Sequence, residues 1–155
     1  MLNAESIYDL LKQVFLVLDD GDQFLFGRFG LSVTRYYALY HLHNQPGSTM
    51  RQLSELMLCD KSNVTRIIKA LEAKGYVRRE PHETDKRSSR LYITETGLEL
   101  QQYVEREQKK FNDLRFASSL SMLNESDVQD VLSRLWDTLS AELQQIKKQA
   151  SAAKG

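Results

Sequence analysis

The sequence predicts a mainly α-helical fold that carries one small β-hairpin, and three observations predict it. Apolar residues recur at three- and four-residue steps over most of the chain, as in helices with one buried face. Capping residues and a Pro46-Gly47 turn divide this pattern into separate helices, two of them short and close together. Residues 76–94 change to a strand-forming composition around a polar middle. At 155 residues, we expect a single domain with a real hydrophobic core.

The helices at the two ends of the chain are predicted from their apolar spacing. The first is expected from about Asn3 to Asp19, whereas residues 19–30 mix turn formers with aromatic residues and receive no assigned path. Thr94 is the expected cap of a helix that runs from Glu95 to about Phe116. A last helix follows Asn124, and its apolar stripe is Val128, Val131, Leu132, Leu135, Trp136, Leu139, Leu143 and Ile146.

The stripe on the last helix is longer than a small domain needs for its own core. We therefore expect residues 1–30 and 96–149 to supply dimerisation helices, which pair two copies of the chain about a two-fold axis. The alternative is that these helices only cover the core of the central segment.

The central segment begins with a helix capped by Ser32, which ends before the Pro46-Gly47 turn. Thr49 and Gln52 have the spacing of a capping box, and a short helix is expected from Thr49 to Leu58. Asp60 is the expected cap of the next helix, whose end is set by Gly75. Two helices in close succession, the second basic on its outer face, predict a helix-turn-helix.

A hairpin is expected directly after this helix pair. Residues 76–81 and 90–94 are predicted to be its strands and residues 82–89 its loop, and Pro81 suits an unpaired edge position. A hairpin in this position is a wing. Residues 31–95 are therefore predicted to form a winged helix-turn-helix lobe.

Charge is distributed unevenly along the chain. The whole sequence has 21 basic and 21 acidic residues, but residues 61–90 hold nine basic and four acidic ones, a local excess of +5. Such polarisation lets one face attract phosphate while the rest of the molecule repels it. The alternative is a solvated charged face without a partner.

Several function classes find no support in the sequence. It has no nucleophile–base pair, glycine-rich phosphate loop or metal-ligand spacing, so we expect no catalytic residue, no metal and no cofactor. Its single cysteine, Cys59, suits a reducing cytoplasm. The acidic start and the lack of an apolar run near about 18 residues predict neither a signal peptide nor a membrane partner.

Several stretches of the central segment follow a known pattern in order and spacing. They are Leu31-Ser32 with Leu39 and Leu42, Leu53-Ser54-Glu55-Leu56, Lys61 to Ile68 with Leu71 to Arg79, Asp85-Lys86-Arg87, and Leu91 to Gly97. Through them, residues 31–97 resemble the MarR family of bacterial transcription regulators. The resemblance implies a homodimer that binds double-stranded DNA at a pseudo-palindromic operator, represses transcription, and is released by a small-molecule effector. The chain departs from the family pattern at Arg35-Tyr36 and at Cys59.

The helix after Asp60 is the predicted recognition helix. A helix that reads the major groove must present short polar and basic side chains near its N-terminus. The candidates are Lys61, Ser62, Asn63, Thr65 and Arg66. The alternative for Ser62 and Asn63 is that they are ordinary first-turn residues.

The resemblance also assigns roles in the hairpin loop. It implies that Arg87 reaches the minor groove from the wing tip, with Lys86 and Arg90 as further DNA contacts. It also implies that Asp85 pairs with an arginine and stiffens the loop. The alternative is an ordinary solvated hairpin.

Three further features are ambiguous. Cys59 is either an oxidation sensor beside a helix N-terminus or a half-buried thiol. The aromatic residues between Phe24 and Tyr40 form either core or an effector pocket. The central lobe could also be a winged-helix module that binds protein without DNA, although its lysines argue against a protein interface.

Overall fold

The computed structural model describes residues 3–85 and 87–152. It divides into two compact units, Met1–Phe111 and Asn112–Gly155, which we describe separately. The boundary between the two units, between Phe111 and Asn112, lies inside a helix. From the sequence, the central lobe was predicted to end at residue 95. The predicted fold class is confirmed, because the chain is mainly helical with one small antiparallel sheet.

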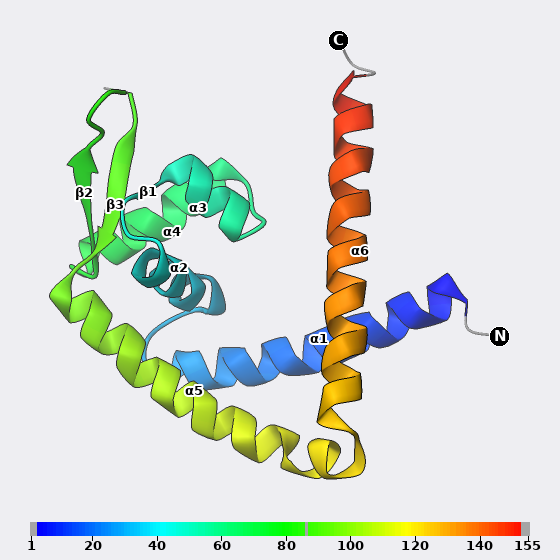
Figure 1. The fold of residues 1–155 in the computed structure, drawn as a ribbon. Helices are drawn as coiled ribbons and strands as arrows, with labels where there is room; N and C mark the ends of the chain where they lie inside the picture. Colours follow the sequence, from blue (N-terminus) through cyan, green and yellow to red (C-terminus); the bar gives the residue numbers. More distant parts are fainter. Residues whose placement is uncertain (1–2, 86, 153–155) are drawn as a thin grey trace. The chain divides into compact units, whose positions relative to one another are not determined.

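The first unit contains most of the elements (Figure 1). They are α1 (Ala4–Gly27), α2 (Val33–Asn44), β1 (Ser48–Thr49), α3 (Met50–Leu56), α4 (Lys61–Ala73), β2 (Val77–Pro81), β3 (Ser89–Ile93) and most of α5 (Glu95–Met122). The second unit holds the end of α5 and all of α6 (Glu125–Ala152). Over the described residues, no helix is both long and apolar enough to cross a bilayer.

Three helix boundaries differ from the sequence prediction. Helix α1 continues through residues 19–27, because Leu25 and Phe26 are buried in the core and their packing outweighs the turn-forming residues before them. Helix α3 ends at Leu56 and not Leu58, and α5 continues past Phe116 to Met122.

The predicted helix caps are confirmed. The side chain of Ser32 accepts a hydrogen bond from the Arg35 amide, and Asp60 accepts one from the Asn63 amide. Thr49 and Gln52 form the expected capping box. After α4, Gly75 has φ +73°, a left-handed conformation that glycine adopts at low cost.

The sheet has three strands in the order β1-β3-β2, so the two-residue β1 adds to the predicted hairpin. Strand β3 lies in the centre, and its Leu91 is fully buried opposite Arg79 of β2 and Ser48 of β1. Pro81 lies at the end of β2, an edge strand, as expected. The hairpin of β2 and β3 projects from the lobe that α2, α3 and α4 form (Figure 1).

The core of the first unit is built around aromatic packing. The rings of Phe26 and Tyr36 are stacked with centroids 4.1 Å apart, and both side chains are buried. The Tyr36 hydroxyl donates a 2.9 Å hydrogen bond to Gln108 Oε1 of α5, so it links α2 to α5. Burial places these two rings in the core, whereas Phe24 is 64% exposed.

Candidate nucleic-acid interface

A cleft of about 600 Å³ lies between the start of α3, the start of α4 and the β2–β3 hairpin. Residues from all three elements line it: Thr49, Met50, Arg51, Lys61, Thr65, Arg79, His82, Asp85, Arg87, Ser88 and Ser89. Four of these side chains are basic and one is acidic. The predicted recognition helix and the predicted wing therefore share one polar, positively biased concave surface.

The N-terminus of α4 is organised by Asp60. Its Oδ1 atom accepts hydrogen bonds from the Asn63 amide, at 2.8 Å, and from the Ser62 hydroxyl. These bonds, that of Ser62 first, lower the pKa of the Asp60 carboxyl below its usual range. The Ser62 proton is thus directed back to the cap, so the outward side of its hydroxyl is an acceptor.

The other polar side chains of α4 also make contacts within the helix. Asn63 Oδ1 accepts a 2.8 Å hydrogen bond from Arg66 Nη2, and the Thr65 hydroxyl donates to the Lys61 carbonyl at 2.8 Å. Lys61 and Arg66 are both exposed. The Asn63 contact restricts the Arg66 guanidinium to one side of the helix.

An ion pair joins the hairpin to α4. Arg79 of β2 donates from Nε and Nη2 to the two carboxylate oxygens of Glu72, each at 2.8 Å. This parallel, two-bond geometry fixes direction as well as distance. The base of the hairpin is therefore oriented by the same helix that carries the candidate base-reading side chains.

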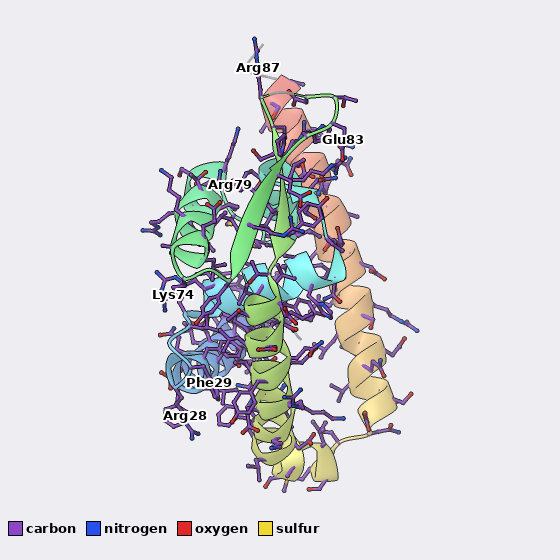
Figure 2. The ribbon with its side chains drawn as sticks, turned by 90° about the vertical axis from the view of Figure 1, so that its left-hand side faces the viewer. Arg28, Phe29, Lys74, Arg79, Glu83 and Arg87 are labelled. Carbon is purple, nitrogen blue, oxygen red and sulfur yellow. The ribbon has the colours of Figure 1, made fainter. Side chains whose placement is uncertain are left out.

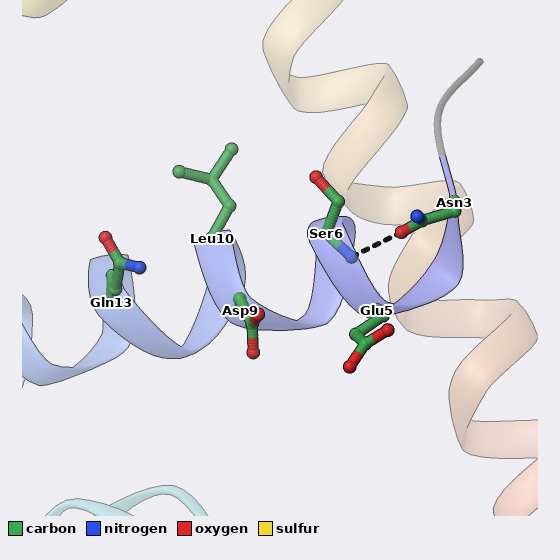
Figure 3. Close-up of a pocket in the computed structure, with 6 residues that line it drawn as sticks. All are labelled: Asn3, Glu5, Ser6, Asp9, Leu10 and Gln13. Carbon is green, nitrogen blue, oxygen red and sulfur yellow. Dashed lines mark hydrogen bonds between the residues drawn. The ribbon is translucent and has the colours of Figure 1, made fainter.

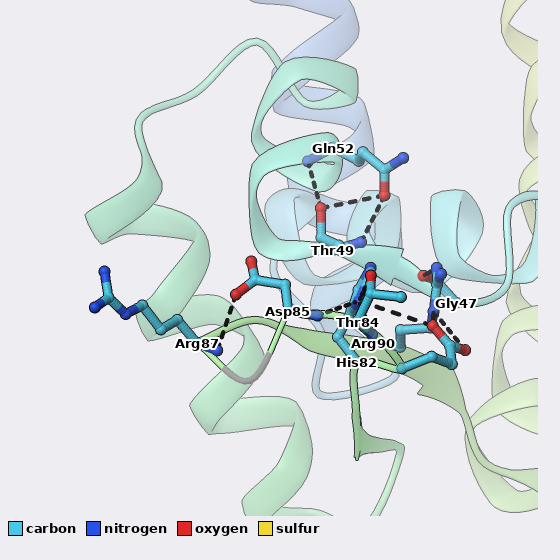
Figure 4. Close-up of polar contacts among 9 residues, drawn as sticks. Gly47, Thr49, Gln52, His82, Thr84, Asp85, Arg87 and Arg90 are labelled. Carbon is cyan, nitrogen blue, oxygen red and sulfur yellow. Dashed lines mark hydrogen bonds and ion pairs between the residues drawn. The ribbon is translucent and has the colours of Figure 1, made fainter.

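Arg90 makes its contacts inside the protein. Its Nε atom donates to both carboxylate oxygens of Glu83, at 3.0 and 2.8 Å, and Nη1 donates to the Gly47 carbonyl at 3.0 Å. The hydrogen bond from Arg90 lowers the pKa of the Glu83 carboxyl. Arg90 thus ties the hairpin loop to the turn before β1 (Figure 4).

The outer end of the hairpin presents Arg87. Asp85 Oδ1 accepts the Arg87 backbone N–H at 3.0 Å, and the Ser88 amide donates to the Asp85 carbonyl at 2.9 Å (Figure 4). Asp85 is thus bonded to the backbone of an arginine in its own loop. Figure 2 shows Arg87 at the outer end of the hairpin and Arg79 nearer its base. Lys86 lies outside the described residues.

The cleft also includes side chains that the sequence did not predict as DNA contacts. They are Thr49, Met50, Arg51, Arg79, His82, Ser88 and Ser89. The capping box marked Thr49 as the start of a helix, and this was the signal that could have placed Met50 and Arg51 beside the hairpin. For His82 the only signal was its position in the polar loop.

Other candidate sites are weaker. Burial raises the pKa of the Cys59 thiol, and the neighbouring Asp60 charge raises it further, so the reactive thiolate is disfavoured. A hollow at the start of α1 is lined only by that helix and its cap, with the Ser6 amide bonded to Asn3 Oδ1 at 2.7 Å (Figure 3). Within the described residues, no three His, Cys, Asp or Glu side chains converge to hold a metal ion.

The fold and this cleft define the chain as a winged helix-turn-helix protein. Residues 29–88 match the model of the MarR family, so this segment of the chain is similar to that family. The resemblance stated from the sequence is thereby confirmed.

Relatives and solved structures agree with this assignment. The chain is 24% identical over 143 residues to the uncharacterised HTH-type transcriptional regulator YybA of Bacillus subtilis, covering 90% of this chain and 95% of that one. It is 26% identical to the HTH-type transcriptional regulator SarZ of Staphylococcus epidermidis, over 70% of this chain and 74% of the relative. The crystal structure of AbsC, a MarR family regulator from Streptomyces coelicolor, superposes with a TM-score of 0.80 at 23% identity, over 93% and 97% of the two chains. The crystal structure of the transcriptional regulator SlyA superposes with a TM-score of 0.75 at 26% identity, over 88% of this chain and 95% of that one.

The family that these residues match consists of transcriptional regulators and not of enzymes.

Proposed function

We propose that the chain is a homodimer that binds a pseudo-palindromic operator in double-stranded DNA and represses transcription until a small-molecule effector releases it. The observation that carries the DNA-binding part is the shared cleft, which brings the exposed start of α4 and the hairpin tip to one basic surface. The effector and the repressor role rest on the family resemblance alone.

The arrangement suits the two grooves of B-DNA. The major groove is about 12 Å wide and admits one helix, and α4 has its polar and basic side chains at the N-terminal end. In this proposal Lys61, Ser62, Asn63, Thr65 and Arg66 contact bases and phosphates. Arg87, with Lys86 beside it, enters the neighbouring minor groove, where a narrow groove concentrates negative potential.

Two of the proposed wing residues have supporting roles. Asp85 holds the backbone of Arg87 and so fixes the direction of the wing tip. Arg90 adds positive charge next to the hairpin loop, while its hydrogen bonds to Glu83 and Gly47 shape the loop.

Exposed apolar side chains on the terminal helices support dimerisation. Tyr8, Leu10, Phe15 and Val17 of α1 are each more than half exposed, and α6 has no buried residue in the range described for it. On α6 the exposed apolar residues are Val131, Leu132, Trp136, Leu139, Leu143 and Ile146, spaced by three or four residues after the first pair. Exposed apolar residues that recur at helical spacing, as they do on α6, are typical of an interface. We propose a second copy of the chain as the partner, because a dimer places two recognition helices on two half-sites.

We also propose that the protein acts in the cytoplasm. A lone half-buried thiol suits that compartment, where the operator DNA lies.

The rival function is a winged-helix module that binds protein without DNA. A protein-binding module would need an interface rich in aromatic residues, and no Phe, Tyr or Trp is among the residues that line the cleft.

Selection of bound sequences from a random duplex pool tests the proposed function. We expect a pseudo-palindrome whose half-sites lie about one helical turn, or a multiple of it, apart. Recovery of no preferred sequence, at a salt concentration where the protein does bind duplexes, would contradict operator recognition. Failure to bind any duplex would contradict DNA binding itself.

A further inference from the structure

The hairpin loop is folded around the imidazole of His82. The backbone amides of Thr84 and Asp85 both point at His82 Nδ1, at 3.3 and 3.2 Å (Figure 4). The His82 amide in turn donates to the Ser88 carbonyl at 3.4 Å and closes the base of the loop. A backbone amide can only donate, so His82 Nδ1 must accept with its lone pair.

This geometry fixes the tautomer of the ring. A neutral imidazole carries one proton, and when Nδ1 is an acceptor that proton is on Nε2. Nε2 makes no hydrogen bond with any residue in the described part of the chain. His82 therefore has one hydrogen-bond donor for which no described residue is the acceptor.

His82 is also one of the residues that line the cleft between α4 and the hairpin. The charged side chains that line this cleft are Arg51, Lys61, Arg79 and Arg87 on the basic side and Asp85 on the acidic side. Arg51 also pairs with Glu55 and Arg79 with Glu72, whereas no ion pair within the described residues involves Lys61 or Arg87. One oxygen of Asp85 is bonded to the Arg87 amide. Glu83 Oε2 lies 3.8 Å from His82 Nδ1, and both Glu83 oxygens accept from Arg90. The surroundings of the imidazole therefore favour an anion in the cleft.

We propose that neutral His82 donates its Nε2–H to a phosphate of the DNA backbone that lies in this cleft. The inference rests on the proposed DNA-binding function and adds a contact to it. The donor is held in place by the two backbone amides, so His82 shapes the loop with one nitrogen and binds the ligand with the other.

The salt dependence of DNA binding distinguishes the proposed contact of His82 from the contacts of the arginines. A cation that binds phosphate releases counterions, so its removal makes the dependence of affinity on salt shallower. A neutral donor releases none. Removal of the His82 donor should therefore lower affinity by the same factor at every salt concentration.

His82→Asn is the discriminating variant. The asparagine Oδ1 is bonded to Cγ, as Nδ1 is in histidine, so it can accept from the same two backbone amides. It has no group in place of Nε2–H. His43→Asn is the matched control, because His43 is exposed on α2 and does not line the cleft. Affinity is measured by fluorescence anisotropy on a selected duplex and on an unrelated duplex, from about 50 to 200 mM salt.

We expect His82→Asn to weaken binding by about three- to tenfold for each half-site, the contribution of one hydrogen bond. The decrease should be equal on both duplexes, the salt slope should match the wild type, and His43→Asn should bind normally. Wild-type affinity for His82→Asn would overturn the proposal and leave the imidazole a loop-shaping role only. Weaker binding with a shallower slope would also overturn it, since the donor would then be a charged ring. Weaker binding confined to the selected duplex would mean a base contact and would overturn it too.

A second measurement does not depend on any variant. Long-range proton–nitrogen correlation spectra of the wild-type protein report which ring nitrogen of His82 carries the proton. We expect the proton on Nε2, and its resonance should move when duplex is added. A proton on Nδ1 would overturn the proposal. If wild-type protein bound no duplex in the anisotropy assay, the proposed function would fail first, and the tautomer would still be measurable.

Discussion

Glu72 of the recognition helix and Arg79 of the hairpin face each other through two parallel hydrogen bonds of 2.8 Å. Because both side chains are about one-third exposed, we expect the pair to contribute only about 0.2 to 1 kcal/mol to the free energy of unfolding. A double-mutant cycle with Glu72→Ala and Arg79→Ala, followed by urea unfolding, measures that coupling. A coupling energy of zero would mean that the pair does not hold the hairpin against α4.

Arg66→Ala tests whether α4 reads bases. If Arg66 pairs with a guanine, its removal should cost about 1 to 3 kcal/mol on the selected operator and relax the preference at one base position. Repeating the duplex selection with the variant measures both effects. Lys69→Ala is the control, because Lys69 is exposed on the same helix but lies nearly one turn farther from its N-terminus and is not among the proposed DNA contacts. An equal decrease in affinity for all DNA sequences would mean that Arg66 contacts only phosphate.

Arg87→Ala tests the wing tip. If Arg87 neutralises one phosphate in each half-site, its removal should reduce the slope of log affinity against log salt by about 0.9 per phosphate. Anisotropy titrations across a salt series measure this slope. If the slope and the affinity both stayed at wild-type values, the tip of the hairpin would have no part in binding.

Gly97→Ala tests the junction between the sheet and α5. A Cβ at this position would clash with the Tyr76 carbonyl oxygen, and the backbone must shift to relieve that clash. We expect a decrease in stability of about 1 to 3 kcal/mol, typical of overpacking. Gly27→Ala is the matched control, since no atom lies within 4 Å of its added Cβ, and alanine there should stabilise α1 by up to about 1 kcal/mol. Chemical unfolding of both variants measures these changes in the free energy of unfolding. An unchanged free energy of unfolding for Gly97→Ala would contradict the close packing of Gly97 against Tyr76.

Leu139→Lys tests the proposed dimer. Leu139 is half exposed on the apolar stripe of α6, so a charge there should split the dimer if the stripe is its interface. Ala141→Lys is the control, because two residues along a helix place its side chain on nearly the opposite face. Light scattering coupled to gel filtration measures the mass. A Leu139→Lys protein that kept the mass of two chains would exclude this stripe from the interface.

Local chemistry made much of the fold predictable. Ser32, Thr49 and Asp60 cap the helices that they were expected to cap, since a side-chain oxygen three residues before an amide is a local signal. The continuation of α1 through residues 19–27 was missed because it depends on the burial of Phe26 against Tyr36, which is a tertiary contact. Strand β1 was missed because two residues carry no periodicity.

The same distinction between local signals and tertiary contacts applies to the candidate site. Lys61, Arg66 and Arg87 could be named from residue type and order along the chain. The engagement of Arg90 with Glu83 and Gly47 could not, because Gly47 is 43 residues away in sequence. The role that we infer for His82 depends on the direction of two backbone amides, and only the folded loop shows it.

The central claim is that this cleft binds duplex DNA chiefly through its cations. Titration of wild-type protein onto its selected duplex at about 50 and 200 mM salt tests that claim most directly. We predict tight binding at low salt that falls by orders of magnitude over this range, as expected when several phosphates are neutralised. Binding that is absent at low salt, or that does not change with salt, would contradict the account.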